Sequence, residues 1–411
     1  MKKIVSKSSI NLGDIATQII DRRGITPKKL GGEFSTKGHP VITADNIKNG
    51  GLIRSHKIRY ISNEMYQKWM KFPIKEDDIL LTSEGSNWGE TYLVTKEFAQ
   101  QNYAAGQRIF CISINKSIID PTFVYLYLSS KLGQFNLKSR ETGSTAKGIR
   151  KNELLKVEIP NPQLIDIKIL KEINNIEKLT HLNKLKIDKI LNFLKSNFHI
   201  KVGKYNNIYE TSKLPINWRK STLEAEQVVF QSGMSYTSEN LKGQKYFMIN
   251  SGNFALNDQF KFDNLKTLSE TKIENKYFVT KNDLVINGTD GQPRQFIGKP
   301  LLIPNLSKKS IISNDLYKVI SKKLSNNFLY LYFLSEEFRE PIRWKSNGTR
   351  AVHIFPEDLN KSSIVVPDDN YIQDFERSIS PYFELITLYL EQIRVFNENR
   401  STLIDHFFNN I

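Results

Sequence analysis

The sequence predicts a mixed α/β protein in which two similar α/β domains alternate with two long helices. Three observations support this fold class: a repeat at half the length of the chain, short strand-like and helical runs within each copy, and a long amphipathic stretch after each copy. With 411 residues, the chain is long enough for two or three domains that each enclose a core.

The repeat is clearest at an aromatic segment. The run Phe-Val-Tyr-Leu-Tyr-Leu at 123–128 returns as Phe-Leu-Tyr-Leu-Tyr-Phe at 328–333, an offset of 205 residues (328 − 123). Asp-Ile-Leu-Leu at 78–81 returns as Asp-Leu-Val-Ile at 283–286. The same offset relates Gly143 to Gly348, Ile149 to Ile354 and Leu154 to Leu359. A unit used twice on one chain suggests two similar binding surfaces related by a pseudo-twofold axis.

The two α/β domains are expected at residues 1–160 and 200–367. Alternating β-branched and aromatic residues predict strands, and Pro121 after Asp120 predicts the start of a helix. The predicted strands lie at 58–61, 108–114, 157–160, 276–280, 316–320 and 364–367, and the predicted helix at 122–132.

Long helices are expected at residues 161–199 and 368–411, and Pro381 is expected to kink or restart the second one. The first would be about 35 residues and roughly 50 Å long, with apolar residues three or four apart. The residues expected on the apolar faces are Ile169, Ile173, Ile176, Leu179, Leu182, Ile379, Phe383, Ile386, Leu390 and Ile393. We expect the helices to pair as an antiparallel coiled-coil spacer with one domain at each end. The alternative is that each helix folds back on its own domain.

Composition narrows the class of partner. The net charge of +16 favours a polyanion such as nucleic acid, although a Lys- and Asn-rich genome could produce the same balance. No run of about 18 apolar residues is present, so no membrane span is expected. The basic first residues lack the apolar core of a signal peptide. The single Cys111 fits a reducing cytoplasm and is expected in the core.

Several of these elements together resemble the specificity subunit of type I restriction–modification systems. The resemblance rests on Leu-Gly-Asp-Ile at 12–15, on the strand and loop at 77–85, and on Gly-Ser-Thr at 143–145. It also rests on Ile-Pro-Asn-Pro at 159–162, which leads into the long helix, and it covers nearly the whole chain. The second copy departs from the pattern at its start, where it has Leu-Glu-Ala at 223–225.

The resemblance implies a DNA reader without a catalytic site of its own. Each domain would bind one half of a split, asymmetric site in double-stranded DNA, and the helices would set the gap between the halves. The helices would also dock two methyltransferase subunits and, through them, ATP-driven restriction and translocase subunits. S-adenosylmethionine, ATP and Mg²⁺ would bind to those partners and not to this chain, and the complex would methylate adenine and serve in phage defence.

The residues themselves point to no catalytic chemistry. A phosphate-binding loop and an amino-methyltransferase signature are absent, and the six histidines are scattered without metal-ligand spacing. Paired carboxylates at 77–78 and 368–369 sit at predicted turns and are expected to cap structure. No metal site is predicted.

Two loops in each domain carry groups suited to DNA. Bases are read in the grooves by Arg, Asn, Gln and acidic side chains, whereas cations and hydroxyls hold phosphates. The base-reading candidates are Ser83, Glu84, Asn87, Trp88, Asn287, Asp290, Gln292, Arg294 and Gln295. The phosphate candidates are Ser144, Thr145, Lys147, Arg150, Lys151, Arg343, Lys345, Thr349, Arg350 and His353. Ordinary turns and solvated basic loops are the alternatives, and the tyrosines at 125, 127, 330 and 332 are expected to pack in the core.

Two other functions are open at this point. A free-standing DNA-binding regulator or architectural protein with paired domains would share the charge and the repeat but would need no enzyme partner. A self-contained nuclease would cleave DNA without other subunits.

Overall fold

The computed structural model divides into two compact units. The first unit comprises Met1–Ile176 with Glu398–Ile411, and the second comprises Glu177–Asn397. The residues that the structure describes are 9–48, 50–52, 58–85, 87–143, 147–161, 167–206, 213–237, 239–255, 257–262, 265–269, 273–290, 294–346, 348 and 352–409. Both boundaries between the units fall inside long helices, and the predicted domain limits at 160 and 200 stay a prediction.

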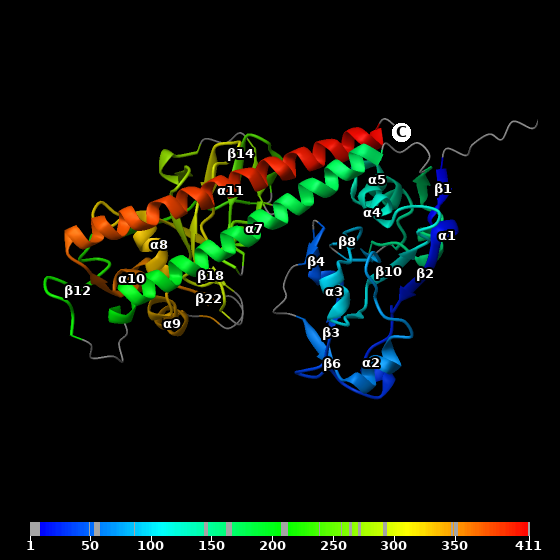
Figure 1. The fold of residues 1–411 in the computed structure, drawn as a ribbon, viewed down its shortest axis with the longest axis horizontal. Helices are drawn as coiled ribbons and strands as arrows, with labels where there is room; N and C mark the ends of the chain where they lie inside the picture. The colour runs from blue at the N-terminus through cyan, green and yellow to red at the C-terminus, as the bar shows by residue number, and fades with distance from the viewer. Residues whose placement is uncertain are drawn as a thin grey trace, which may run out of the picture. The chain divides into compact units, whose positions relative to one another are not determined.

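The first unit is built on a four-stranded antiparallel sheet in the order β2-β10-β7-β8 (Figure 1). A smaller sheet, β6-β3-β9, and the pairs β1-β11 and β4-β5 complete it. The strands are β1 Ser9–Asn11, β2 Ala16–Asp21, β3 His39–Ile42, β4 Ile47–Lys48, β5 Gly51–Leu52, β6 Arg59–Ile61, β7 Ile79–Thr82, β8 Thr91–Leu93, β9 Ala104–Ala105, β10 Ile109–Ile114 and β11 Glu158–Pro160. The helices are α1 Leu12–Ile15, α2 Asn63–Trp69, α3 Lys96–Gln100, α4 Pro121–Ser129, α5 Lys131–Ser139 and α6 Lys151–Leu154.

The second unit repeats this plan with the sheets β13-β21-β17-β19 and β15-β14-β20-β16 and the pairs β12-β23 and β18-β22. The strands are β12 Arg219–Thr222, β13 Val229–Ser232, β14 Tyr246–Ile249, β15 Lys266–Leu268, β16 Phe278–Val279, β17 Leu284–Asn287, β18 Thr289–Asp290, β19 Pro300–Leu302, β20 Ser310–Ile312, β21 Leu316–Ile320, β22 Val352–His353 and β23 Ser363–Val366. The helices are α8 Asn326–Leu334, α9 Glu336–Lys345 and α10 Pro356–Asn360. The long helices are α7 Ile167–Lys201 and α11 Asp369–Asn409.

Backbone hydrogen bonds show that the second unit is a true copy of the first, including its divergent start. Leu12 N donates to Val157 O at 2.8 Å in the first unit. Leu223 N donates to Ser362 O at 3.1 Å in the second. The departure at 223–225 is therefore a change of sequence on the same backbone frame.

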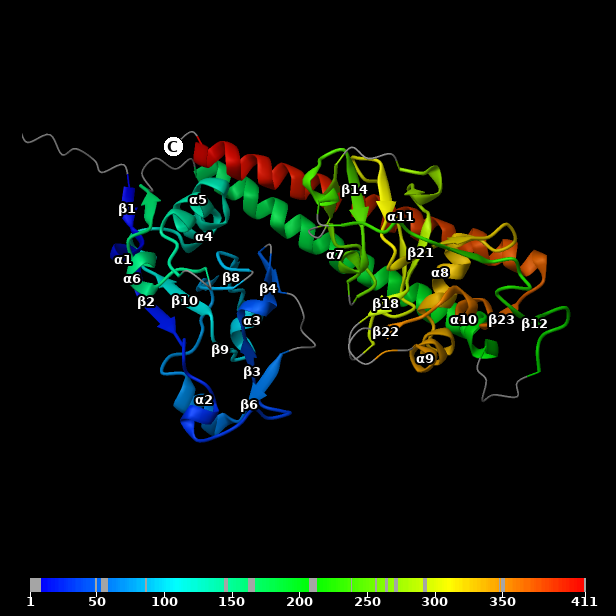
Figure 2. The ribbon, with the colours of Figure 1, turned by 180° about the vertical axis from the view of Figure 1, so that it is seen from behind.

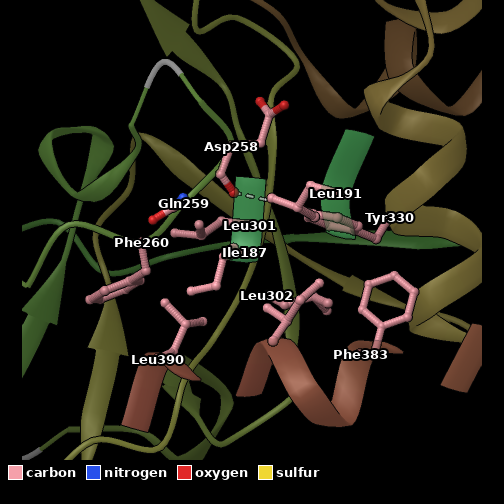
Figure 3. Close-up of a pocket in the computed structure, with 11 residues that line it drawn as sticks. Ile187, Leu191, Asp258, Gln259, Phe260, Leu301, Leu302, Tyr330, Phe383 and Leu390 are labelled. Carbon is pink, nitrogen blue, oxygen red and sulfur yellow. Dashed lines mark hydrogen bonds between the residues drawn. The ribbon is translucent and has the colours of Figure 1, made fainter. Parts of the chain in front are cut away.

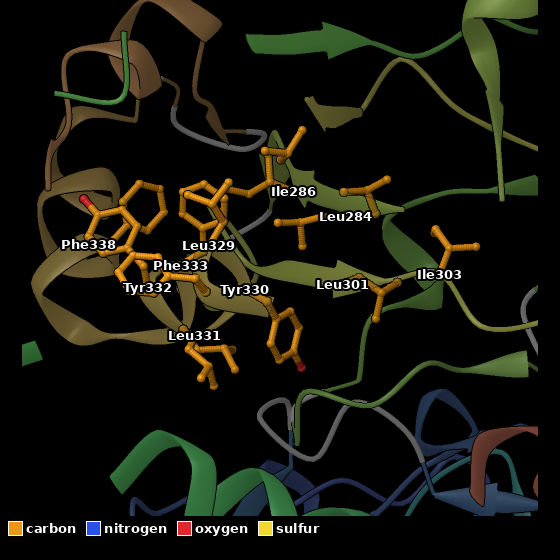
Figure 4. Packing of buried hydrophobic residues seen from close by; sticks show 14 of the residues in the cluster. Leu284, Ile286, Leu301, Ile303, Leu329, Tyr330, Leu331, Tyr332, Phe333 and Phe338 are labelled. Atoms are coloured by element: carbon orange, nitrogen blue, oxygen red, sulfur yellow. The ribbon is translucent and has the colours of Figure 1, made fainter. Parts of the chain in front are cut away.

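Each copy buries its aromatic helix in its core, as predicted. Figure 4 shows side chains of α8 and Phe338 of α9 packed against strand residues such as Ile286 and Leu301. All four repeated tyrosines are buried, at 5% exposed or less. Because every side chain of α8 from Phe328 to Leu334 is buried, the run reads as continuously apolar instead of amphipathic.

The predicted helix over 122–132 is wrong at its end. The structure has α4 and then a separate helix α5, and Ser130 lies between them. Its Oγ accepts a hydrogen bond from Gly133 N at 3.0 Å, which caps α5 and lets the chain turn there. The strand predicted over 276–280 is also reduced to β16, because residues 275–277 form a short 3₁₀ helix.

The long helices α7 and α11 pair in antiparallel fashion, as predicted. Within the second unit they lie side by side in both views (Figures 1 and 2). There the Phe198 ring lies 6.0 Å from the Phe375 ring, and Asn183 Nδ2 donates to Gln392 Oε1 at 2.8 Å. Within the first unit the start of α7, including Ile173, shares a core with the end of α11.

Two expectations about these helices need correction. Helix α11 does not restart at Pro381, because Ile379 and Phe383 on either side are both buried in the second core and outweigh the lost backbone hydrogen bond, whereas a kink at Pro381 stays a prediction. The predicted apolar stripe of α7 is only partly enclosed: Leu179 and Leu182 are 46% and 45% exposed. The buried positions on that part of α7 are Ile187, Leu191, Leu194 and Phe198, which pack on the second core.

The remaining helix candidates are enclosed to different degrees. Ile173, Ile379, Phe383, Ile386, Leu390 and Ile393 are buried, and Ile169 and Ile176 are half-buried. The two predicted arrangements, helix pairing and packing of each helix on an α/β core, therefore each hold in part. The helices pair with each other and also pack on the α/β cores.

Candidate nucleic-acid interface

Two loops that are distant in sequence meet at one end of the central sheet in each unit. The strand-end loop follows β7 or β17 and spans 83–90 or 288–298. The closing loop precedes α6 or α10 and spans 142–150 or 346–355. The residues predicted from the sequence to contact DNA lie in or beside these two loops.

Backbone hydrogen bonds join the loops in the same way in both units. Ile149 N donates to Ser83 O at 2.8 Å, and at the same offset of 205 residues Ile354 N donates to Gly288 O at 3.0 Å. The next residues extend the pairing, since Glu84 bridges to Gly148 and Thr289 pairs with His353. The structure thus brings together, twice, the two loops that the sequence singled out separately.

Side chains at the base of the strand-end loop hold its shape. In the first unit Thr82 Oγ1 donates to Asn87 O, and Gln134 Nε2 donates to Gly89 O at 2.7 Å. Trp88 packs against the first core, which leaves its ring partly enclosed. These contacts hold the loop firmly against the sheet.

The second unit holds its strand-end loop with an acidic cap. The Asp290 carboxylate accepts from Phe296 N and, at 3.2 Å, from Ile297 N. Asn287 Nδ2 donates to Phe296 O at 3.2 Å. Arg294 Nη1 donates to Arg343 O at 2.7 Å, which ties the strand-end loop to the last turn of α9.

These contacts correct part of the base-reading prediction. Ser83 is 1% exposed and Asn287 is fully buried, so neither side chain faces solvent, and Asn287 ties its own loop. Asp290 is committed to backbone donors. Glu84, Asn87, Trp88, Arg294 and Gln295 are half-buried at the rim, and Gln292 lies outside the described residues.

Cations gather on the closing loops and beside them. Lys147, Arg150 and Lys151 are exposed in the first unit, as are Lys345 and His353 in the second. Lys147 pairs with Glu141 at 3.1 Å and Arg343 with Glu336 at 2.6 Å. Exposed ion pairs of this kind are weak, so a phosphate can compete for the cation. The candidates Ser144, Thr145, Thr349 and Arg350 lie outside the described residues.

Three groups at these loops were missed from the sequence. Arg23 and Tyr317 each hold a closing loop, and Trp344 at the end of α9 is 78% exposed. Strand register could have pointed to Tyr317, because it occupies the place that Phe110 has in the first unit. Arg23 and Trp344 have no counterpart at a repeated position, so the repeat gives no signal for them.

Elsewhere the described residues offer no catalytic constellation. They contain no group of three or more His, Cys, Asp and Glu side chains placed to hold a metal ion. Burial raises the pKa of the Cys111 thiol well above its usual value, and the neighbouring Asp78 acts in the same direction. A thiol with that pKa is a weak nucleophile at neutral pH.

A small cavity in the second unit lies between α7, α11 and residues 258–260 (Figure 3). Its walls are mostly apolar, and its Asp258 carboxylate is paired with Lys195 at 3.1 Å and Lys299 at 2.8 Å. Gln259 Nε2 donates to Lys184 O on α7 at 2.8 Å. The polar groups of this cavity therefore anchor α7 to the second core.

Comparison with known proteins finds similarity to type I restriction–modification proteins. Residues 6–192 match the family described as the type I restriction modification DNA specificity domain. The type I restriction enzyme MjaVIII specificity subunit of Methanocaldococcus jannaschii is 24% identical over 377 residues, which cover 87% of this chain and 81% of the relative. The region that matches the family contains the whole α/β part of the first unit.

Solved specificity subunits are also similar along the whole chain. The S subunit of a type I restriction–modification system from M. genitalium is 16% identical, with 97% of this chain and 94% of that chain covered and a TM-score of 0.44. The HsdS subunit from Thermoanaerobacter tengcongensis is 12% identical, with 97% and 96% covered and a TM-score of 0.33. Among the helices in the described part of the chain, none combines the length and the apolar character that a membrane span needs.

Proposed function

We propose that this chain is the specificity subunit of a type I restriction–modification complex and that each of its units reads one half of a bipartite, asymmetric site in double-stranded DNA. The observation that carries the proposal is the loop pair, which both units build with the same backbone hydrogen bonds and surround with cations. The side chains on the two pairs differ, so the two half-sites would differ in sequence. Phosphate contacts by the cations would position each unit, and half-buried side chains at the rim would reach the bases.

The helices α7 and α11 would set the distance between the half-sites and dock two methyltransferase subunits. The support for docking is an apolar surface on the helices: Leu179, Leu182 and Leu185 of α7 and Leu388 of α11 are 43% to 48% exposed. Apolar residues that recur at three-residue spacing on one helix are typical of a surface that another subunit covers. Restriction and translocase subunits would join through the methyltransferases.

The complex would then methylate adenine in each half-site and restrict DNA that lacks the mark. S-adenosylmethionine, ATP and Mg²⁺ would bind to the partner subunits, and this chain would supply recognition alone. The proposed place of action is the cytoplasm.

The test is methylation of DNA with and without the methyltransferase of the same host. We expect the complex to methylate a bipartite motif that genome-wide methylation mapping reports, and the chain alone to bind DNA containing that motif without altering it. Methylation or cleavage by the purified chain alone would contradict the proposal. Purification from the host without any methyltransferase would favour a free-standing DNA-binding regulator or architectural protein.

A further inference from the structure

One carbonyl oxygen in each closing loop is held by a side chain, and the two units use different side chains for it. In the first unit Arg23 Nη1 donates to Ile149 O at 3.1 Å. In the second unit Tyr317 Oη donates to Ile354 O at 3.0 Å. Ile149 and Ile354 are equivalent positions of the repeat, and their amides make the backbone bonds that join the loops.

Strand register shows why the donors differ. Phe110 pairs with Leu81 in the first sheet, and Tyr317 pairs with Ile286 in the second, so the two aromatic residues hold equivalent strand positions. Phe110 has no hydroxyl to offer. Arg23 supplies the missing donor, with its guanidinium 4.8 Å from the centre of the Phe110 ring and its Nη2 2.6 Å from the Asp21 carboxylate.

The residue that faces the ring has changed as well. Gly288 in the second unit stands where the first unit has Ser83, and a Cβ atom at Gly288 would collide with the Tyr317 ring. The position of the Tyr317 ring therefore requires glycine at 288 in the strand-end loop. In the first unit, where Arg23 is the donor, the equivalent position carries the side chain of Ser83. Burial raises the pKa of Tyr317, so its hydroxyl keeps the proton that it donates.

We propose that Arg23 and Tyr317 are positioning residues that hold the closing loop of their own unit in the shape that discriminates bases. Neither needs to touch DNA. The inference rests on the proposed function, and it adds that selectivity in each half-site depends on a residue in the strand framework behind the loops. A loop held less firmly can adapt to a wrong base pair, which lowers the discrimination between sites.

The first experiment measures the loop without DNA. In the full chain, Tyr317→Phe removes one hydroxyl, and we expect hydrogen exchange in the peptide around Ile354 to accelerate about two- to tenfold, as loss of one neutral hydrogen bond implies. Tyr332→Phe is the matched control, because Tyr332 is also buried in the second unit and its Oη donates to Ser363 O at 2.6 Å. Unchanged exchange at Ile354 in Tyr317→Phe would overturn the proposal.

The second experiment measures selectivity with the methyltransferase complex on DNA carrying the mapped motif. Tyr317→Phe should raise methylation of singly mismatched sites about two- to tenfold in one half only, and Arg23→Met should do so in the other half only. Equal relaxation in both halves, or none despite faster exchange, would overturn the positioning role. If the wild-type complex methylates no bipartite motif, the proposed function itself has failed, which is a distinct result.

A transplant tests the geometry directly. Arg23→Met combined with Phe110→Tyr and Ser83→Gly installs the solution of the second unit in the first. We expect this triple variant to regain the slow exchange at Ile149 that Arg23→Met loses. Failure to regain it, in a variant that melts like Arg23→Met, would show that Arg23 acts in some other way.

Discussion

Each unit has an aspartate at the start of its central strand. The side-chain partner of this aspartate differs between the units. Asp78 accepts from the Cys111 thiol at 3.4 Å, whereas Asp283 pairs with Lys318 Nζ at 2.7 Å. Strand register makes Cys111 and Lys318 equivalent. Both aspartates also cap the preceding turn by accepting a backbone hydrogen bond, at 2.8 Å from Lys75 and 2.7 Å from Thr280.

The comparison separates what the fold needs from what it tolerates. The turn cap is kept in both units because a backbone amide must be satisfied there. The second partner of the carboxylate differs, since either a thiol or an ammonium group can donate to it. The loops follow the same rule, with identical backbone bonds and different side chains. A shared backbone with different side chains would allow the two units to bind different half-sites without a change of fold.

Removing a ring from the core of the first unit should give the largest effect and tests whether the units are energetically separate. Phe408 is 1% exposed and its ring lies 5.4 Å from Phe123 and 5.3 Å from Tyr127. Phe408→Ala should destabilise the first unit by about 3–5 kcal/mol through lost burial and a cavity. Scanning calorimetry should show one transition falling while the transition of the second unit stays.

The matched control is Phe135→Ala, because Phe135 is 70% exposed on α5 of the same unit. It should change stability by no more than about 0.5 kcal/mol. A uniform fall of both transitions in Phe408→Ala would show that the two units melt as one.

Lengthening α7 and α11 at the boundaries between the units tests whether these helices set the spacing of the two half-sites. Four residues inserted between Ile176 and Glu177, and four between Asn397 and Glu398, add roughly 6 Å to each helix without entering either core. We expect the methylated motif to keep both halves and gain about one to two base pairs between them, at 3.4 Å per pair. Methylation mapping reads this directly.

The same insertion in α7 alone serves as the control for helix pairing. It would lengthen α7 but not α11 between the two units, so the helices could not keep their pairing in both units at once, and methylation should be abolished instead of the spacing changed. If the doubly lengthened variant methylates half-sites with an unchanged number of base pairs between them, the helices do not set the spacing.

Loss of cations from one closing loop should weaken binding without changing which bases are chosen. Arg150→Ala with Lys151→Ala removes two exposed cations of the first unit. If both touch phosphates, the slope of log affinity against log salt should flatten by about 1.8, which corresponds to 0.9 per contact. Fluorescence anisotropy over a salt series measures the slope.

Lys116→Ala is the matched control, since Lys116 follows the far end of β10 and pairs with Asp77 at 2.6 Å. It should leave the slope nearly unchanged. Equal slopes in the double variant and in the control would place the phosphates elsewhere.

The smallest expected effect is a pH dependence that Cys111 should give to the first unit. Because burial raises the pKa of Cys111, the unfolded chain loses this proton at lower pH than the folded chain does. The contribution of Cys111 is thus fully present below about pH 8.5 and is lost as pH rises above it, by at most about 1.4 kcal/mol per pH unit. Melting between pH 7.5 and 9.5 should show this slope in the first transition.

Cys111→Ala should remove that slope whatever it does to the melting temperature itself. The second unit has no cysteine, so Cys111→Ala should leave the pH dependence of its transition unchanged. A slope that survives Cys111→Ala would have to come from another group.

Much of the fold could be predicted, because the repeat and the apolar periodicity are local signals. The helix pairing and the buried aromatic helices follow from them. The break at Ser130 was missed because α4 is apolar on all sides and shows no period that would mark its end. Leu179 and Ile187 look alike in sequence, yet only Ile187 is buried, because the second core covers that part of α7.

The candidate loops were found because polar residues after a strand and cations beside glycine are visible in sequence. The contact between the strand-end loop and the closing loop was not predicted. A backbone bridge joins Glu84 to Gly148, and the side chains in the sequence give no sign of it. The burial of Ser83 and Asn287 was missed for a related reason. A polar side chain at the end of a strand serves equally well to bind a ligand or to tie its own loop.

The continuity of α11 has a consequence for biosynthesis. Ile404, Phe407 and Phe408 belong to the core of the first unit, although nearly all of the second unit lies between them and the rest of that core in the sequence. A ribosome therefore makes most of the first unit early but completes its core only after residue 408 has emerged. The second unit needs nothing beyond Asn397 and can fold before the first is finished. Nascent chains should accordingly expose the side of α4 that contacts Phe408 until residue 408 has emerged, which makes this side a natural site for chaperone binding.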